Sequence, residues 1–239
     1  MNALPLLLVP GLMCDHAVWN PVLPQLNAIT ACAIVDHGQA DSLKTMAVQI
    51  LHAAPPSFAV AGHSMGARVA MEVWRLAPER VKGIALLDTG YLPKVPGAEG
   101  DEEVRKRMHL LYLAQTQGVR AMAQQWSQGM VHPDRLNDMD LMEAIWAMFE
   151  RKSAATFALQ IHALIHRADA TDVLSSLKVP TLIACGRQDA WSTLAQHEAM
   201  HRLAPQAVLE VIEDAGHMAS MEKPDAFAQV ILRWLARVH

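Results

Sequence analysis

The stretch FAVAGHSMGARVAMEV, residues 58–73, decides the fold. Its apolar run 58–61 is short and follows two prolines, which favours a buried parallel strand over a helix. Beyond this run, apolar residues recur at helical spacing until Pro78 discourages further helix, at Val69, Ala70, Val73, Trp74 and Ala77. The pattern therefore predicts a strand and a helix joined by a sharp turn at Ser64.

Ser64 lies between Gly62 and Gly66, whose lack of a Cβ lets neighbouring backbone approach a tight bend. A serine on such a turn exposes its hydroxyl at the edge of the sheet, and the N–H of Met65 points into the same space from the start of the helix. The stretch thus predicts a nucleophile with half of an oxyanion hole. The alternative is a chance Gly-x-Ser-x-Gly match in which Ser64 only forms a turn or caps a helix.

Further apolar runs of strand length occur along the chain, mostly separated by helix-like stretches. They lie at 4–9, 31–35, 81–87, 181–185 and 208–212. Strands that alternate with helices predict a mostly parallel sheet of about six strands with helices on both faces. Ligands bind such sheets outside the carboxyl ends of the strands, so each strand end is a candidate for the site.

The alternation breaks between residues 91 and 177, where no convincing strand occurs. Amphipathic patterns predict helices at 104–117, 119–128, 141–151 and 154–166. The segment LPKVPGAEGDEE, residues 92–103, is interpreted as a loop from its prolines, glycines and acidic residues. We therefore expect a core domain formed by residues 1–90 and 178–239, with residues 91–177 as a helical cap inserted after the fourth strand.

Length and composition limit the function classes. The chain has 239 residues, enough for one α/β domain with a substantial core, and its formal net charge of −4 argues against nucleic acid or an anionic membrane as a partner. No run approaches a membrane span, and the opening residues MNALPLLLVPGLM lack the basic start and cleavage site of a signal peptide. Cys14, Cys32 and Cys185 have no paired spacing, which favours a reducing, cytoplasmic location.

Three other strand ends carry residues that complete a hydrolytic site. Gly11 follows the first strand, and the N–H of Leu12 beyond it would be the second oxyanion donor. Asp189 follows the fifth strand, and His217 follows the last one. The order Ser64, Asp189, His217 matches the α/β-hydrolase arrangement. Asp88, at the end of the fourth strand, is an alternative acid, although it also suits a strand-end turn.

The chemistry requires these residue types. A serine hydroxyl is a poor nucleophile until a neighbouring imidazole takes its proton, and the imidazole must later protonate the leaving group. Histidine suits both steps because its ordinary pKa, about 6.5, lies near neutral pH. The aspartate orients the imidazole and stabilises its cation.

The chain resembles the α/β-hydrolase superfamily over nearly its whole length, particularly the small lidded carboxylesterases, lactonases and carbon–carbon bond hydrolases. The resemblance is carried by VPGLMCDHAVW, GHSMGARVAMEV, APERVKGIALLDT, VPTLIACGRQDA and EDAGHMASMEKP. It implies that Ser64, Asp189 and His217 are the triad, that Leu12 and Met65 donate to the oxyanion, and that the helical insertion is a cap. The family's usual N-terminal hairpin is expected to be missing.

Two readings from other classes stay open. HEAMH, residues 197–201, matches the His-Glu-x-x-His zinc signature, with His197 and His201 as ligands and Glu222 as a conceivable third, although its helix should pack on the flank of the sheet. A non-enzyme alternative is a sensor that binds a small apolar molecule under the cap.

The residues together predict a serine hydrolase that uses no metal and no organic cofactor. Its mostly apolar cap predicts an uncharged, small to medium acyl substrate, most simply a carboxylic ester, and no lone arginine or lysine stands out as a carboxylate anchor. Thioester, lactone and carbon–carbon cleavage on the same triad remain alternatives. We expect a small-molecule partner, no nucleic acid and no membrane, and the sequence leaves a homodimer open.

Overall fold

The computed structural model describes residues 4–238, which form a six-stranded parallel sheet. The strand order is β2-β1-β3-β4-β5-β6. The strands are β1 (Leu6–Val9), β2 (Cys32–Ile34), β3 (Phe58–His63), β4 (Val81–Leu87), β5 (Thr181–Gly186) and β6 (Val208–Ile212). The predicted fold class is confirmed, and within residues 4–238 the sheet contains no antiparallel hairpin before β1.

Burial separates the central strands from the edges. Every residue of β1, β3 and β5 is buried, because helices cover both faces of a parallel sheet. The edge strands β2 and β6 are only partly buried over most of their length. The fully buried strands therefore correspond to the apolar runs predicted at 4–9, 58–61 and 181–185.

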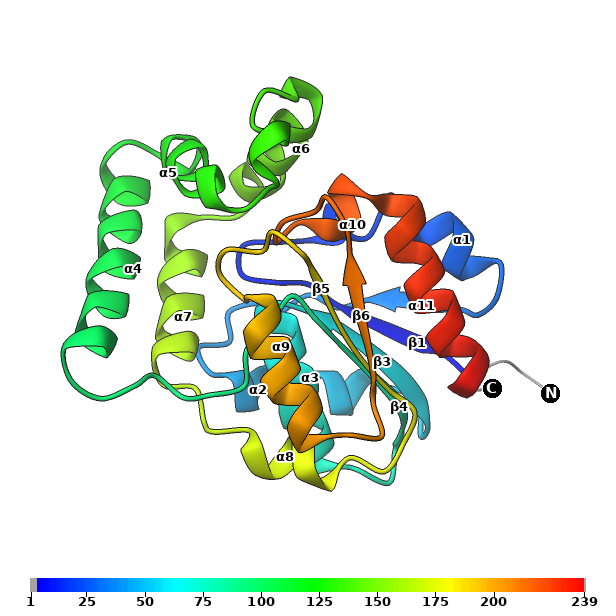
Figure 1. Cartoon of the computed structure of the whole chain (residues 1–239). Coiled ribbons are helices and arrows are strands. Elements are labelled where there is room, and N and C mark those ends of the chain that lie inside the picture. Colours follow the sequence, from blue (N-terminus) through cyan, green and yellow to red (C-terminus); the bar gives the residue numbers. More distant parts are fainter. Residues whose placement is uncertain (1–3, 239) are drawn as a thin grey trace.

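Helices lie on both faces of the sheet (Figure 1). One face carries α1 (Leu23–Asn27) and α11 (Pro224–Val238), which contact each other, and the short α10 (Ala219–Glu222) leads into α11. The other face carries α2 (Leu43–Ala53), α3 (Met65–Leu76), α8 (Thr171–Ser176) and α9 (Leu194–Leu203). A 3-10 turn, η1 (His16–Val18), follows β1.

The register brings the carboxyl ends of the strands to one edge. Gly62 at the end of β3 pairs with Val9 of β1 and Leu86 of β4, and Gly186 of β5 pairs with Ile212 of β6. The loops that follow β1, β3, β4, β5 and β6 therefore start from the same edge of the sheet.

A helical insertion, residues 91–177, separates β4 from β5. Its helices are α4 (Ala98–Thr116), α5 (Val119–Trp126), α6 (Met139–Glu150) and α7 (Ala154–Ile165), with 3-10 turns η2 (Ser127–Gly129) and η3 (Pro133–Arg135), before α8 returns to the sheet. Helices α4 and α7 lie side by side at one side of the molecule, and α5 and α6 lie beyond one end of the sheet (Figure 1).

The predicted loop at 92–103 is wrong from Ala98 onward, because α4 begins there. Gly97 has φ +81°, a conformation that glycine adopts easily, so the chain can turn directly into the helix. Glu99 and Asp101 then stand in the first turn, where the helix dipole favours negative charge. The acidic residues that suggested a loop are helix-starting residues instead.

The insertion packs on the core through aromatic rings. Trp126 of α5 lies 5.3 Å from Phe149 of α6 and 5.6 Å from Phe157 of α7, measured between ring centroids. It also stacks on Trp191, in the loop after β5, at 5.2 Å. Within the described part of the chain, no helix is both long and apolar enough to cross a membrane.

Candidate active site

Ser64 is the residue between β3 and α3, and its backbone is strained. Its φ of +56° lies in a region that side chains other than glycine rarely adopt. Its N–H donates to the carbonyl of Leu87 in β4 at 2.8 Å, and the Thr89 hydroxyl donates to its carbonyl at 2.9 Å. A Cβ on Gly66 would overlap the carbonyl oxygen of Val9, so the turn needs glycine there. These contacts hold the hydroxyl at the carboxyl edge of the sheet.

His217 and Asp189 lie in line with that hydroxyl. His217 Nε2 is 2.9 Å from Ser64 Oγ, and His217 Nδ1 is 2.8 Å from Asp189 Oδ2. The three residues come from the loops after β3, β5 and β6, and 125 or more positions separate Ser64 from the other two. The structure thus brings together the three side chains that the sequence nominated.

The Asp189 carboxylate is buried and fully engaged. Its Oδ1 accepts hydrogen bonds from the N–H groups of Trp191 and Ser192, both at 2.9 Å. Burial by itself raises the pKa of this carboxyl, but the neighbouring His217 and the hydrogen bonds hold the pKa below its ordinary value. Asp189 is therefore ionised at neutral pH and can orient the His217 ring through Nδ1.

The loop that carries His217 is fixed from two sides. His63 Nε2 donates to the carbonyl of His217 at 2.8 Å. Glu222 accepts hydrogen bonds from the N–H of Gly216 at 2.9 Å and of His132 at 2.6 Å. Burial, followed by the nearby His217, lowers the pKa of His63 to about 4, so His63 is neutral at pH 7. Sequence reasoning did not single out His63, although it directly precedes Ser64.

Leu12 and Met65 both line the cavity that contains Ser64. The N–H of Met65 belongs to the first residue of α3, where a helix offers no acceptor of its own. Next to Leu12, Met13 has φ +61°, and its N–H donates to Oε1 of the buried Gln160 in α7 at 2.8 Å. Helix α7 therefore contacts the loop whose N–H we expect to face the oxyanion.

Asp88, the alternative acid, occupies a different position. It is fully buried, its Oδ1 accepts from the N–H of Gly186 at 2.9 Å, and its side chain makes no hydrogen bond to His217 among the described residues. Burial, followed by the charge of Asp189, raises the pKa of its carboxyl well above the ordinary value. Asp88 therefore supports the β5 loop, and Asp189 is the acid in contact with His217.

The geometry argues against a zinc site formed by the HEAMH segment, residues 197–201. His197 uses both ring nitrogens: Nε2 accepts from the N–H of Thr89 at 3.1 Å, and Nδ1 donates to the carbonyl of Thr193 at 2.9 Å. Glu222 is engaged in the loop contacts described above. Within residues 4–238, no three His, Cys, Asp or Glu side chains cluster as a metal site would require.

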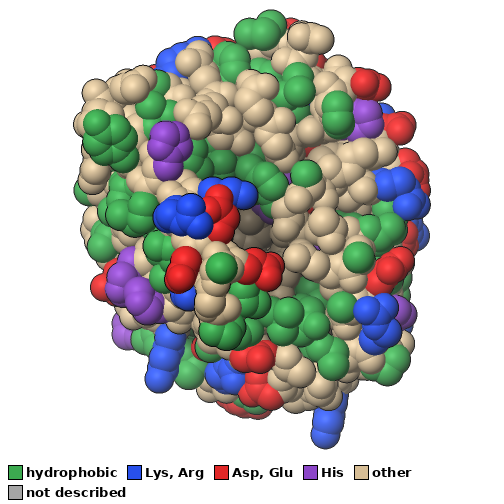
Figure 2. Space-filling view, turned by 60° about the vertical axis from the view of Figure 1, so that its left-hand side comes forward, with side chains coloured by type: hydrophobic (Ala, Val, Ile, Leu, Met, Phe, Trp, Pro, Cys, Tyr) green, Lys and Arg blue, Asp and Glu red, His purple; other side chains and the backbone are tan. Residues whose placement is uncertain are grey.

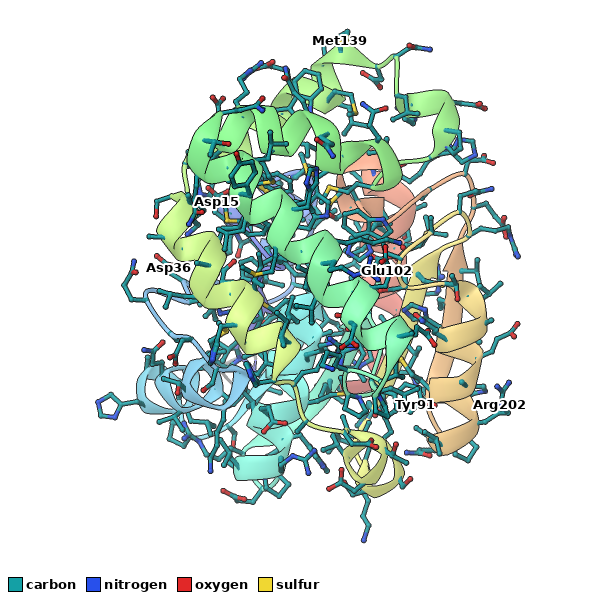
Figure 3. All side chains as sticks on the ribbon, turned by 90° about the vertical axis from the view of Figure 1, so that its left-hand side faces the viewer. Asp15, Asp36, Tyr91, Glu102, Met139 and Arg202 are labelled. Carbon is teal, nitrogen blue, oxygen red and sulfur yellow. The ribbon has the colours of Figure 1, made fainter. Side chains whose placement is uncertain are left out.

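A cavity of about 1090 Å³ opens over Ser64, and both the core and the insertion line it. Ser64, His217 and Trp191 come from the core, and Trp126, Phe157 and Leu164 come from the insertion. Tyr91 and Glu102, labelled in Figure 3, also belong to the lining. Figure 2 shows the hollow on this face, with Lys, Arg, Asp and Glu side chains gathered at its rim.

Four arginines line the cavity; Arg105 is largely exposed, and the other three were missed from the sequence. They are Arg68 of α3, Arg107 of α4 and Arg167, which follows α7. Arg68 stands four residues after Ser64 in the predicted helix, so helical spacing could have placed it beside Ser64. No local pattern links it to Arg107 and Arg167, because they converge only when the insertion folds over the sheet.

Comparison with known proteins gives a consistent picture. A family model described as the alpha/beta hydrolase family matches residues 6–230. The chain is 27% identical, over 244 residues, to a pimeloyl-(acyl-carrier protein) methyl ester esterase of Photobacterium profundum, covering 95% of this chain and 92% of that protein. It also spans 58% of the length of a Haemophilus influenzae protein, to which it is 26% identical over 178 residues.

Solved structures agree with the fold. A thermophilic esterase from Thermogutta terrifontis superposes with a TM-score of 0.87 and 27% identity, covering 100% of this chain and 91% of that chain. An enol-lactonase from Burkholderia xenovorans LB400 superposes with the same TM-score of 0.87 at 20% identity, covering 99% of this chain and 92% of that chain, and shows likeness of fold alone.

Proposed function

The chain belongs to the alpha/beta hydrolase family, and we propose that this hydrolase cleaves a carboxylic ester or a related acyl bond through an acyl-enzyme on Ser64. The observation that carries the proposal is the line of contacts from Ser64 Oγ to His217 Nε2, at 2.9 Å, and from His217 Nδ1 to Asp189 Oδ2, at 2.8 Å. The line starts at a strained turn in the floor of a cavity large enough for a small-molecule substrate.

In the proposed first step, Ser64 Oγ attacks the substrate carbonyl carbon while its proton passes to His217 Nε2. The carbonyl oxygen becomes an oxyanion, which the N–H groups of Leu12 and Met65 stabilise; one such donor is typically worth about 10²–10³ in rate. The ionised Asp189 stabilises the imidazolium through Nδ1. When the intermediate collapses, His217 returns the proton to the leaving alkoxide, and the alcohol departs.

Deacylation repeats the sequence with water. His217 takes a proton from the water molecule as its oxygen attacks the acyl carbon, and then returns that proton to Ser64 Oγ as the acid leaves. The neutral His63 supports both steps by fixing the main chain of His217 without adding a positive charge beside its ring.

We also propose that residues 91–177 act as a cap over the site. The support is that α4, α5 and α7 all contribute to the cavity lining, through residues such as Leu110, Trp126 and Phe157. Trp126 stacks on Trp191, whose ring in turn lies 5.2 Å from the His217 ring. A cap in this position limits the access of solvent and selects the acyl groups that reach Ser64.

The test is hydrolysis of p-nitrophenyl esters of increasing acyl length, with and without a fluorophosphonate that labels active serines. We expect turnover, and a single adduct on Ser64 by peptide mass spectrometry that abolishes it. Ser64→Ala should give neither, while keeping the near-ultraviolet circular dichroism of the parent. Labelling at another serine, or turnover that survives Ser64→Ala, would reject the proposal.

A parallel sample treated with a chelator tests the zinc reading of residues 197–201. We expect unchanged turnover, because His197 is committed to hydrogen bonds with Thr89 and Thr193. Loss of activity to the chelator, restored by added zinc, would favour a metal-dependent hydrolase.

A further inference from the structure

Arg68 stands at the cavity wall, one helical turn after Ser64. Its Nη1 donates to the carbonyl of Leu92 at 3.1 Å. Its Nη2 lies beside Gly90, where an added Cβ would come within 3.0 Å of that nitrogen. Among residues 4–238, no carboxylate lies within ion-pair distance of Arg68. Arg68 therefore lines the cavity without an ion pair of its own, and Glu103 is the carboxylate whose charge acts on it.

Two more arginines share one carboxylate close to Arg68. Arg167 Nη1 and Nη2 donate to the two oxygens of Glu103 at 2.6 and 2.9 Å, and Arg107 Nε donates to Glu103 Oε1 at 3.0 Å. The side chains are mostly shielded: 10% of Arg167, 24% of Arg107 and 25% of Glu103 is exposed. Three guanidinium groups thus face a single carboxylate, which leaves an excess of positive charge in a shielded wall.

The pKa values of Arg68 and Glu103 are shifted in the directions that this excess of positive charge predicts. Burial, then Arg167 and Arg107, lower the pKa of Arg68 to about 9, so Arg68 stays charged at pH 7 under repulsion from its neighbours. Burial raises the pKa of Glu103, but Arg167 and Arg107 outweigh it and bring the pKa to about 2. An additional anion among the arginines would relieve the repulsion.

The other charged residues of the cavity lie at its rim. Glu102 of α4 pairs with Arg105 at 2.6 Å and Lys106 at 3.7 Å, and both basic side chains are largely exposed. Glu99 is also exposed. Solvent screens these groups, so they do not neutralise the shielded arginines.

We propose that Arg68, Arg107 and Arg167 form a subsite for a carboxylate on the substrate, so that the preferred substrate is a monoester of a dicarboxylic acid or a related acyl compound with a free carboxylate. The proposal rests on Ser64 being the nucleophile. Arg167 already gives its fork to Glu103 and its Nε to the carbonyl of Leu92, so it contributes charge to the subsite. Nε and Nη2 of Arg68 make no hydrogen bond among the described residues, and this edge of a guanidinium matches a carboxylate with two parallel hydrogen bonds. Because Arg68 and Ser64 are one turn apart, the free carboxylate lies a few atoms from the scissile carbonyl. The proposed substrate therefore carries a negative charge, in place of the uncharged substrate expected from the sequence.

The experiment compares matched pairs of methyl esters by methanol release. The charged series is monomethyl succinate, glutarate and adipate, and the neutral series is methyl butanoate, pentanoate and hexanoate. We expect at least one chain length at which kcat/KM favours the charged ester by about tenfold or more, since a hydrogen bond to a charged group is worth that much. Equal or better hydrolysis of the neutral ester at every length would overturn the subsite.

Variants localise the effect. Arg68→Gln should lower the charged-to-neutral ratio of kcat/KM by about tenfold, and Arg68→Lys should lower it less because the charge is kept. The matched control is Arg202→Gln, which makes the same charge change on the exposed outer side of α9 and should keep the wild-type ratio (Figure 3). A ratio unchanged in Arg68→Gln would remove Arg68 from the subsite.

A binding measurement separates this proposal from the proposed function. Succinate, glutarate and adipate are added at one ionic strength, and the melting temperature is followed. At least one diacid should stabilise the wild type and Arg202→Gln, and stabilise Arg68→Gln much less. This result supports the subsite even if no methyl ester is cleaved, in which case the serine hydrolase proposal alone fails. Equal stabilisation of all three proteins, or of none, overturns the subsite.

Discussion

The N–H of Met13 donates a hydrogen bond of 2.8 Å to Oε1 of Gln160, across 147 positions of sequence. Both residues are buried, and Met13 has a positive φ that few side chains adopt without support. The contact ties the loop after β1 to α7 of the insertion. The insertion therefore supports, from outside the sheet, a loop that lines the candidate active site.

Removing this contact should lower the turnover number. Gln160→Met keeps the volume of the side chain but removes the acceptor, so the loop that carries Leu12 loses its support and the oxyanion donor is displaced. We expect kcat for a p-nitrophenyl ester to fall about tenfold or more, since the complete loss of one donor costs about 10²–10³. Gln115→Met on the exposed side of α4 is the control and should leave kcat unchanged. Equal values for both variants would contradict the prediction.

The two buried aspartates should differ sharply in their effect on catalysis. Asp189→Asn removes the charge beside His217 Nδ1 and favours the wrong tautomer, so we expect turnover to fall by about 10³-fold or more. Asp88→Asn keeps the oxygen that accepts from Gly186, and it replaces a carboxyl whose pKa is raised well above the ordinary value by burial and by the charge of Asp189. It should retain most activity. The opposite ranking in kcat would identify Asp88 as the acid.

The strained backbone of Ser64 predicts that replacing this serine by glycine stabilises the protein relative to alanine, although both variants lose the hydroxyl. Ser64→Gly and Ser64→Ala both remove the hydroxyl, but only glycine adopts φ +56° without strain. We expect Ser64→Gly to unfold in urea with a free energy about 1 kcal/mol higher than that of Ser64→Ala. A lower free energy for Ser64→Gly would mean that the turn is relaxed.

Buried His63 should make the protein less stable in mild acid. Its pKa is about 4 in the folded protein and about 6.5 when unfolded, so the unfolded chain binds more protons between these values. The stability that depends on neutral His63 is complete above pH 6.5 and is lost as the pH falls toward 4, with a slope of at most about 1.4 kcal/mol per pH unit.

Urea unfolding at pH 7.5, 6.0 and 5.0 measures this slope. His63→Gln keeps an N–H for the carbonyl of His217 but cannot titrate, so its stability should change less over the same range. His37 and His197 also have pKa values lowered by burial and supply the residual slope. Parallel curves for the two proteins would show that His63 does not titrate with folding.

Some features of this protein follow from the sequence alone. The strands at 81–87 and 208–212 have the predicted bounds, because each is a mostly apolar run of strand length bounded by turn residues. The turn at Ser64 is equally local, since it needs two glycines and a change from strand to helix periodicity. The positions of Asp189 and His217 after strands follow from the same reasoning.

The start of α4 and the contacts between the insertion and the core could be seen only in the tertiary structure. The start of α4 at Ala98 depends on a glycine backbone angle and on a dipole effect within a segment whose composition is typical of a loop. The approach of Arg107 and Arg167 to Arg68, and the bond from Met13 to Gln160, join residues from distant helices and loops. Periodicity reports which face of an element is buried, but not which element meets that face. The sequence by itself therefore determined the fold and the place of Ser64 on the turn after β3, whereas the packing of the insertion decided the charge and the shape of the cavity.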